Sequence, residues 1–162
     1  MWRSTTENME VKIKRLDESA IIPTKATKGS VAYDLYAPCD MIIRCGRQII
    51  DLRFAIELPN GREAKIEPRS GYSSKGFAGS LDYTKEEPDM RFNCDVLTGK
   101  VDYDYRGSVG VIVNNNDRAF CIKRGQRIAQ MTIYKVEDTD LVEVDELSET
   151  DRGTGGYGSS GN

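Results

Sequence analysis

The sequence contains no histidine. This absence excludes histidine-based nucleophilic triads, histidine metal sites and histidine general bases, so acid–base chemistry must use Asp, Glu, Tyr, Lys or Cys. The chain also lacks a Cys-x-x-Cys pair, which argues against a structural zinc site. Four cysteines are nevertheless present, at Cys39, Cys45, Cys94 and Cys121. Without a secretion signal, we expect reduced, mostly buried thiols rather than disulfides.

Long apolar runs and a strong excess of one charge are also absent. No stretch approaches the roughly 20 apolar residues of a membrane-spanning helix, and residues 1–8 lack the apolar core of a signal peptide. We therefore expect a cytoplasmic protein, or one in the host cytoplasm or nucleus if the gene is viral or phage-borne. The 23 basic and 26 acidic residues give a net charge of −3. This balance argues against nucleic-acid binding, but it permits a small anion held by a few arginines.

Apolar residues recur at strand-like rather than helical spacing. Period-two alternation occurs in residues 9–13, 129–133 and 141–144, and residues 49–58 form a longer strand candidate. Many short strands separated by Gly, Pro and Asn predict an all-β barrel or sandwich. Only residues 70–79 have a composition compatible with a helix, because they contain few β-branched side chains.

Two segments have irregular composition. Residues 81–90 are acidic and include Pro88, which is typical of an exposed loop. Residues 148–162 are dominated by Gly, Ser and Thr, and composition alone predicts a flexible terminus. The length suits one domain, so we predict a β body over residues 1–147 and a C-terminal arm over residues 148–162.

Five short segments place charged, small or polar side chains where a plain core strand would not. They are residues 31–37 (VAYDLYA), 67–72 (EPRSGY), 99–107 (GKVDYDYRG), 125–130 (GQRIAQ) and 151–161 (DRGTGGYGSSG). The second suits phosphate binding by backbone amides at a turn. The third suits a tight hairpin, with carboxylates and rings able to face a base or sugar. The fifth could wrap a polyphosphate without being a P-loop. Each alone would more often be an ordinary strand, turn or tail.

In this order, the five segments resemble the five motifs of the trimeric dUTPases, from about Pro23 to Gly161. The resemblance implies a jelly-roll-like, distorted β-barrel that forms a homotrimer, with each active site drawing on all subunits. It implies Mg²⁺-dependent hydrolysis of dUTP to dUMP and pyrophosphate, which lowers dUTP and supplies dUMP for thymidylate synthesis. The C-terminal arm would cross to a neighbouring subunit and order over bound nucleotide.

The resemblance also implies roles for individual residues. Asp102 would activate the attacking water, and Tyr105 would lie beneath the deoxyribose, leaving no space for a 2′-hydroxyl. Backbone groups of Gly99 and Val101 would read the uracil edge. Asp34 would support Mg²⁺ through water, with the metal held mainly by the triphosphate. The remaining substrate contacts would come from Arg69, Ser70, Gly71, Arg127, Gln130, Arg152, Tyr157, Gly158, Ser159 and Ser160.

This chemistry needs only the residue types present. A carboxylate orients water for in-line attack on the α-phosphorus, while positioning and charge neutralisation supply most of the rate. Cytosine reverses two hydrogen-bonding groups of the uracil edge, so a site built for uracil would reject it by roughly 10⁴-fold. The 5-methyl group of thymine would be excluded by shape.

The chain departs from the family pattern at several positions. Gln126 stands where the fourth motif usually has Asp, which puts the anchoring of Arg127 in question. Tyr157 replaces the usual Phe and can still stack, and Lys100 adds a cation that we expect to point to solvent. Extra residues around 79–93 form an acidic insert, which we interpret as an inert loop or a partner-binding surface.

Three other functions compete with this interpretation. A dCTP deaminase would share the barrel and trimer but would need a glutamate for proton transfer and would lack this arm. A nucleotide-sensing regulator would bind dUTP and a protein without turnover. An unrelated β-barrel binding module would leave the order of the motifs unexplained.

Overall fold

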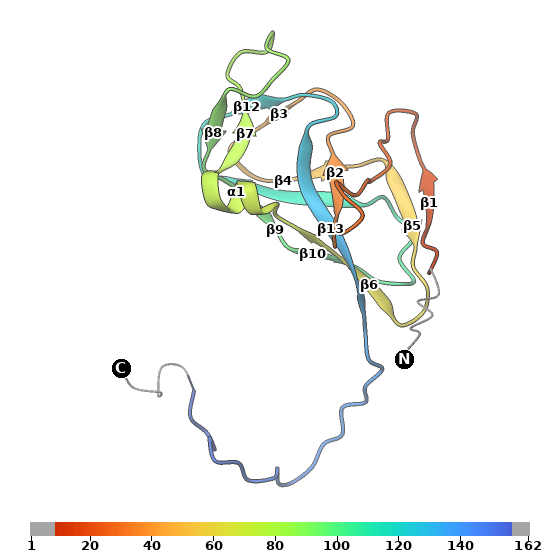
Figure 1. Cartoon of the computed structure of the whole chain (residues 1–162). Coiled ribbons are helices and arrows are strands. Elements are labelled where there is room, and N and C mark those ends of the chain that lie inside the picture. The colour runs from red at the N-terminus through yellow and green to blue at the C-terminus, as the bar shows by residue number, and fades with distance from the viewer. Residues whose placement is uncertain (1–8, 157–162) are drawn as a thin grey trace.

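A computed structural model describes residues 9–156 of the chain, which contain thirteen strands and one short helix (Figure 1). The elements are β1 (Lys12–Arg15), β2 (Tyr33–Tyr36), β3 (Met41–Ile43), β4 (Gly46–Asp51), β5 (Phe54–Glu57), β6 (Arg62–Glu67), α1 (Ser70–Lys75), β7 (Phe77–Gly79), β8 (Met90–Phe92), β9 (Cys94–Leu97), β10 (Gly99–Val101), β11 (Gly110–Asn115), β12 (Phe120–Ile122) and β13 (Arg127–Lys135). The predicted all-β class is confirmed. None of the helical residues in this part of the chain forms a span long and apolar enough to cross a bilayer.

Two larger antiparallel sheets and three two-stranded sheets make up the body. The four-stranded sheet has the order β10-β6-β13-β2, and the three-stranded sheet has the order β4-β11-β9. The two-stranded pairs are β1-β5, β12-β3 and β7-β8. Strand β11 shows why such sheets form, since its residues alternate regularly between half-buried and buried positions. The inward side chains include Val111 and Val113, which join one continuous apolar core.

An aromatic cluster packs beneath α1 and supports the helix. The rings of Tyr72 and Phe77 lie 4.5 Å apart, those of Phe77 and Phe120 5.7 Å apart, and those of Phe92 and Phe120 stack at 4.1 Å. Such pairs add about 0.5–1.5 kcal/mol each beyond their burial. The cluster thus fixes a helix too short to be stable alone.

Two predicted elements are shorter in the structure. The helix expected within residues 70–79 ends at Lys75, because Gly76 has a φ of 85° and the chain then forms β7. The single strand expected over residues 49–58 is divided into β4 and β5 by a corner at Leu52-Arg53, where Arg53 has a φ of 61°. Asp51, two residues before Arg53, holds this corner, as described below.

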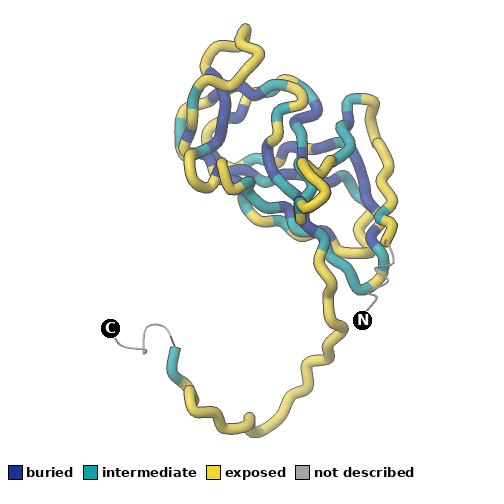
Figure 2. Tube along the Cα trace, in the orientation of Figure 1, coloured by how far each residue is buried: buried dark blue, intermediate teal, exposed yellow. Residues whose placement is uncertain are grey.

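Residues 141–144, predicted as a strand, have no strand partner within the described part of the chain. They belong to a long extended segment that leaves the body after β13 (Figure 1) and is exposed nearly throughout (Figure 2). A strand needs a hydrogen-bonded neighbour, and the exposed backbone of this segment is left to water, so period-two alternation alone does not make a strand. The division between body and arm at residue 147 stays a prediction.

All four cysteines are free. Cys94 and Cys121 are buried, Cys39 is half-buried and Cys45 is exposed. The expectation of unpaired thiols is therefore confirmed, whereas the expectation of burial is right for only two of the four. Burial raises the pKa of the Cys94 thiol to about 12.

Candidate active site

The segment predicted to bind phosphate lies between β6 and α1. Pro68 ends the strand, since it cannot donate a ladder hydrogen bond, and Arg69 takes the N-cap position with extended backbone angles. The carbonyl of Arg69 accepts the first bonds of the helix from the amides of Tyr72 and Ser73, at 2.8 and 3.0 Å. The amides of Ser70 and Gly71 lie in the first helical turn, where intrahelical partners are lacking.

Strand register brings three of the predicted motifs together. Gln130 on β13 lies opposite Asp34 on β2 and, on its other side, opposite Glu67 at the end of β6. Asp34, Arg69, Ser70, Gly71 and Gln130 consequently line one cavity of about 540 Å³. These five residues, together with the neighbouring Arg127, are called the phosphate cluster below.

Asp34 joins the two arginines of this cluster. Its Oδ1 accepts a hydrogen bond from Arg69 Nε at 3.0 Å, and its Oδ2 lies 3.6 Å from Arg127 Nη1. The Asp34 side chain is only 12% exposed, whereas that of Arg127 is 52% exposed. One carboxylate therefore orients two guanidinium groups, each of which keeps donors free for an anion.

The predicted catalytic carboxylate lies on the loop of residues 102–107. This loop is wider than the tight hairpin expected from the sequence, because β9 pairs with β11 while β10 leaves to pair with β6. Within the loop, the amide of Tyr105 donates to the carbonyl of Asp102 at 3.1 Å, and the Tyr105 hydroxyl donates to the carbonyl of Ser108 at 3.1 Å. Asp102 lines a second cavity of about 630 Å³.

Asp102 and the phosphate cluster are far apart in one chain. Val101 pairs with Ala64, three residues along β6 from Glu67. Asp102 lies one residue further from Glu67, so its separation from Asp34 is about 13 Å along the strands and about 14 Å across the three strand intervals. The two cavities share no lining residue. Within a single chain, the phosphate cluster and Asp102 thus line two separate cavities.

Gln126 anchors the turn before Arg127 in place of the aspartate usual in the fourth motif. Its Nε2 donates to the carbonyl of Ala78 at 2.6 Å and to the hydroxyl of Tyr72 at 3.1 Å. The Tyr72 hydroxyl in turn donates to the carbonyl of Arg127 at 2.7 Å. Burial raises the pKa of Tyr72, so this phenol stays protonated as a donor. Tyr72 lies inside a singled-out motif, but nothing in the sequence marked this supporting role.

The remaining predicted residues take separate positions. Lys100 points to solvent as expected, with its Nζ 3.0 Å from Glu63 Oε2, and this hydrogen bond lowers the pKa of Glu63. Arg152 is exposed, and its Nε donates to the carbonyl of Gly155 at 2.8 Å. The substrate contacts predicted for Tyr157, Gly158, Ser159 and Ser160 lie outside the described residues.

The groups available for a metal are few. Among residues 9–156, no group of three or more Asp, Glu or Cys side chains has a geometry suited to a metal ion. Asp34 is already engaged by two arginines. These residues fit a cation held chiefly by phosphate oxygens and water, with at most one carboxylate nearby.

A β-body with a cavity for anions beside Arg69 and Arg127, and with a separate loop carboxylate, has the features of a protein that binds phosphorylated ligands. Comparison with known proteins specifies the family. A family model described as dUTPase matches residues 18–82 and 91–161. The deoxyuridine 5′-triphosphate nucleotidohydrolase of Arabidopsis thaliana is 41% identical over 152 residues, covering 93% of this chain and 82% of that protein. The corresponding protein of Nautilia profundicola is 39% identical over 155 residues, covering 94% and 99%.

The fold is likewise similar to solved structures. The Staphylococcus bacteriophage 80alpha dUTPase with dUPNHPP superposes with a TM-score of 0.78 at 24% identity, covering 94% of this chain and 99% of that one. This chain belongs to the dUTPase family. Its activity is that of a dUTP diphosphatase, the hydrolysis of dUTP to dUMP. The family match omits residues 83–90, which lie within the segment predicted to be an insert.

Proposed function

We propose that Asp102 is the general base of this hydrolysis and that each active site combines half-sites from different subunits of a homotrimer. The observation that carries the proposal is the separation of Asp102 from the phosphate cluster within one chain. A carboxylate must lie within hydrogen-bonding reach of the water it activates. Only a second copy of the chain can bring Asp102 to a phosphate held by Arg69 and Arg127.

In the proposed reaction, the Asp102 carboxylate accepts a proton from water as the water oxygen attacks the α-phosphorus in line. The bond from the α-phosphorus to the oxygen bridging to the β-phosphorus breaks, and pyrophosphate leaves with that oxygen. Arg69, Arg127 and the first-turn amides of α1 stabilise the charge on the phosphates. Mg²⁺ bound to the triphosphate would supply charge neutralisation of the pyrophosphate leaving group, and Asp34 would be the carboxylate available to its water ligands.

Strand β10 is placed to read the base. It forms the outer edge of its sheet among the described residues, and we propose that backbone groups of Gly99 and Val101 bind the uracil edge. The ring of Tyr105 is 47% exposed and sits on the following loop. We propose that this ring packs beneath the deoxyribose and excludes a 2′-hydroxyl.

Two exposed apolar surfaces argue for assembly into a trimer. A cavity of about 440 Å³ is lined largely by apolar side chains, among them Ile13, Val31 and Met131. In the extended segment after β13, Leu141 is fully exposed and Leu147 is nearly so. Exposed apolar groups in an extended chain gain about 1.5–3 kcal/mol each when buried. We propose that this segment packs on a neighbouring subunit and delivers the arm, with Arg152 and residues 157–160, to the neighbour's site.

The insert around residues 79–93 is proposed to be an inert loop. The loop is attached to the body, since Lys123 Nζ donates to the carbonyl of Tyr83 at 2.7 Å, and within the loop Lys85 pairs with Asp89. A partner-binding surface is the second candidate, favoured by the exposed carboxylates of Glu86 and Glu87 beside a basic cavity of about 390 Å³. We further propose that the enzyme works in the cytoplasm, or in that of a host.

Pyrophosphate release from dUTP, dCTP, dTTP and UTP, each with and without Mg²⁺, tests the proposal. We expect turnover with dUTP and Mg²⁺ alone, and a loss of about 10²-fold or more in kcat for Asp102→Asn. Full activity of that variant would refute Asp102 as the base. Tight dUTP binding without turnover by the unaltered chain would instead identify a regulator.

A mixing experiment tests the shared sites. An Asp102→Asn chain and an Arg69→Ala chain, each inactive alone, would regain activity when dissociated and reassembled together, because some mixed sites contain two intact halves. No recovery in verified mixed trimers would place both residues in the same chain's site.

A further inference from the structure

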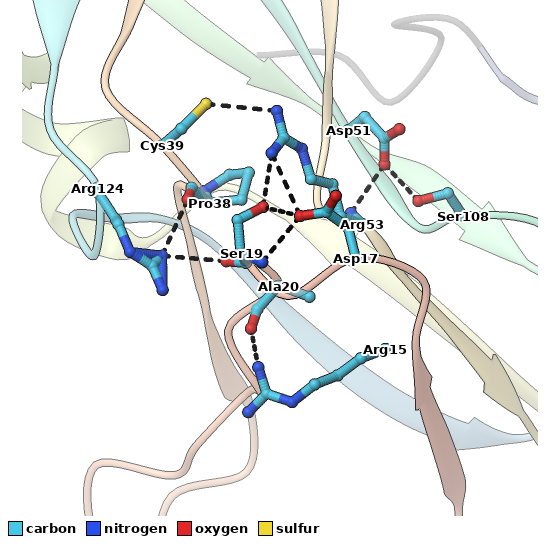
Figure 3. Close-up of polar contacts among 10 residues, drawn as sticks. All are labelled: Arg15, Asp17, Ser19, Ala20, Pro38, Cys39, Asp51, Arg53, Ser108 and Arg124. Atoms are coloured by element: carbon cyan, nitrogen blue, oxygen red, sulfur yellow. Dashed lines mark hydrogen bonds and ion pairs between the residues drawn. The ribbon is translucent and has the colours of Figure 1, made fainter.

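The corner between β4 and β5 is held by one carboxylate. Oδ1 of Asp51 accepts a hydrogen bond from the amide of Arg53 at 2.8 Å and another from the hydroxyl of Ser108 (Figure 3). Arg53 has a φ of 61°, a left-handed conformation that side chains other than Gly rarely adopt without local support. Asp51 therefore stabilises an unfavourable backbone and joins it to a second segment.

That second segment is the end of the loop that carries Asp102 and Tyr105. The carbonyl of Ser108 accepts a hydrogen bond from the hydroxyl of Tyr105 at 3.1 Å. Val109, the next residue, forms backbone hydrogen bonds to both sides of the corner. The amide of Leu52 donates to the carbonyl of Val109 at 2.9 Å, and the amide of Val109 donates to the carbonyl of Phe54 at 2.8 Å. These hydrogen bonds fix the position of the end of the loop relative to the corner.

The corner is also attached to the loop that follows β1 and to Cys39. Nη1 of Arg53 donates to Ser19 Oγ at 2.6 Å and lies 3.6 Å from Asp17, while its Nη2 donates to Cys39 Sγ at 3.6 Å (Figure 3). Hydrogen bonds from Ser19 lower the pKa of Asp17, which keeps that carboxylate charged near Arg53. Arg53 is therefore held at its backbone amide by Asp51, which also binds Ser108, and at its guanidinium group by the contacts just described.

We propose that Asp51 is a positioning residue for sugar recognition, acting through Ser108 on the ring of Tyr105. This inference rests on the role of Tyr105 proposed above. The ring is half exposed, so packing alone does not fix it, and its hydroxyl bond to Ser108 sets its direction. The position is tight, since a Cβ at Gly107 would collide with the Tyr105 hydroxyl. A small shift of Ser108 consequently moves the ring that excludes the 2′-hydroxyl.

Substitutions of Asp51 test the inference because one oxygen makes both bonds. Asp51→Ala removes that oxygen, whereas Asp51→Asn keeps an acceptor in the same place and serves as the matched control. We expect Asp51→Ala to lower the preference for dUTP over UTP, as the ratio of kcat/KM values, by about 3- to 10-fold. Asp51→Asn should stay within about twofold of the unaltered enzyme, and Ser108→Ala should resemble Asp51→Ala.

Thermal unfolding of each variant separates positioning from stability. A merely structural Asp51 would lower Tm and activity on dUTP and UTP alike, without changing their ratio, and that result would overturn the inference. Equal loss of preference in Asp51→Ala and Asp51→Asn would overturn it too, because the shared oxygen would then be irrelevant.

Tyr105→Ala distinguishes this failure from failure of the proposed function. If Tyr105→Ala admits UTP but Asp51→Ala does not, only the inference about Asp51 is wrong. If Tyr105→Ala leaves the preference unchanged, the proposed role of the ring is wrong and the role of Asp51 is refuted with it.

Discussion

Asp34 illustrates how much a single residue contributes to the phosphate cluster. Its carboxylate is nearly enclosed and contacts Arg69 and Arg127 together. Without its charge the two guanidinium groups would repel each other and lose their common orientation. The sequence identified all three residues by motif, but their contact depends on the register of β2 against β13, which no local pattern encodes.

Removing the charge of Asp34 should weaken substrate binding more than turnover. We expect Asp34→Asn to raise the KM for dUTP by about tenfold, because the arginines become less well oriented toward the phosphates. Steady-state kinetics would measure it. The control is Asp40→Asn, which alters an exposed carboxylate paired with Lys123. An unchanged KM in Asp34→Asn would show that the arginines are oriented by other contacts.

The cysteines give a second prediction for single residues. The reactive form of a thiol is its thiolate, and burial raises the pKa of Cys94 from 9.0 to about 12. At pH 8 its thiolate is therefore rarer by about 10³-fold than for an unshifted group. We expect iodoacetamide to label exposed Cys45 in the native protein and to spare Cys94, as peptide mass spectrometry would show. Rapid native labelling of Cys94 would mean that β9 opens readily.

At the scale of the element, Gly76 determines where α1 ends. It has a φ of 85°, and a Cβ there would lie 2.7 Å from the carbonyl oxygen of Phe92 on β8. We expect Gly76→Ala to lower the free energy of unfolding by about 2 kcal/mol or more. The control Gly29→Ala should change it by less than about 0.5 kcal/mol, since that site is open. Urea titration would measure the free energy of unfolding of both variants. Equal losses in the two would rule out the positive φ of Gly76 and the contact with Phe92 as the cause.

The elements also show how far the sequence could predict the structure. Hydrophobic alternation identified the all-β class, because it reflects burial of one strand face. The alternation missed the corner at Leu52-Arg53. There the Asp51 carboxylate accepts a hydrogen bond from the Arg53 amide, and this bond overrides the apolar pattern of residues 49–58. The motifs located the phosphate cluster, whereas the supporting bonds of Gln126 and Tyr72 depend on tertiary contacts.

At the scale of the whole molecule, the chain carries its two half-sites about as far apart as its sheet is wide. The four-stranded sheet holds the phosphate cluster at one end and leads to Asp102 at the other. Under the proposed function, catalysis depends on assembly, because neither half alone both holds the phosphates and activates water. The proposal then makes the exposed segment after β13 a determinant of activity as well as of stability.

The same segment allows assembly to be tested without touching either half-site. Val142 and Val144 share one face of an extended chain and Glu143 lies on the other. We expect Val142→Asp with Val144→Asp to shift the protein from trimer toward monomer in sedimentation velocity, because buried charges oppose packing on a neighbour. Specific activity should fall in parallel and recover as protein concentration rises, whereas Glu143→Gln should stay trimeric and active. A dissociated variant with full activity at low concentration would disprove the shared site, since a monomer would then possess both halves.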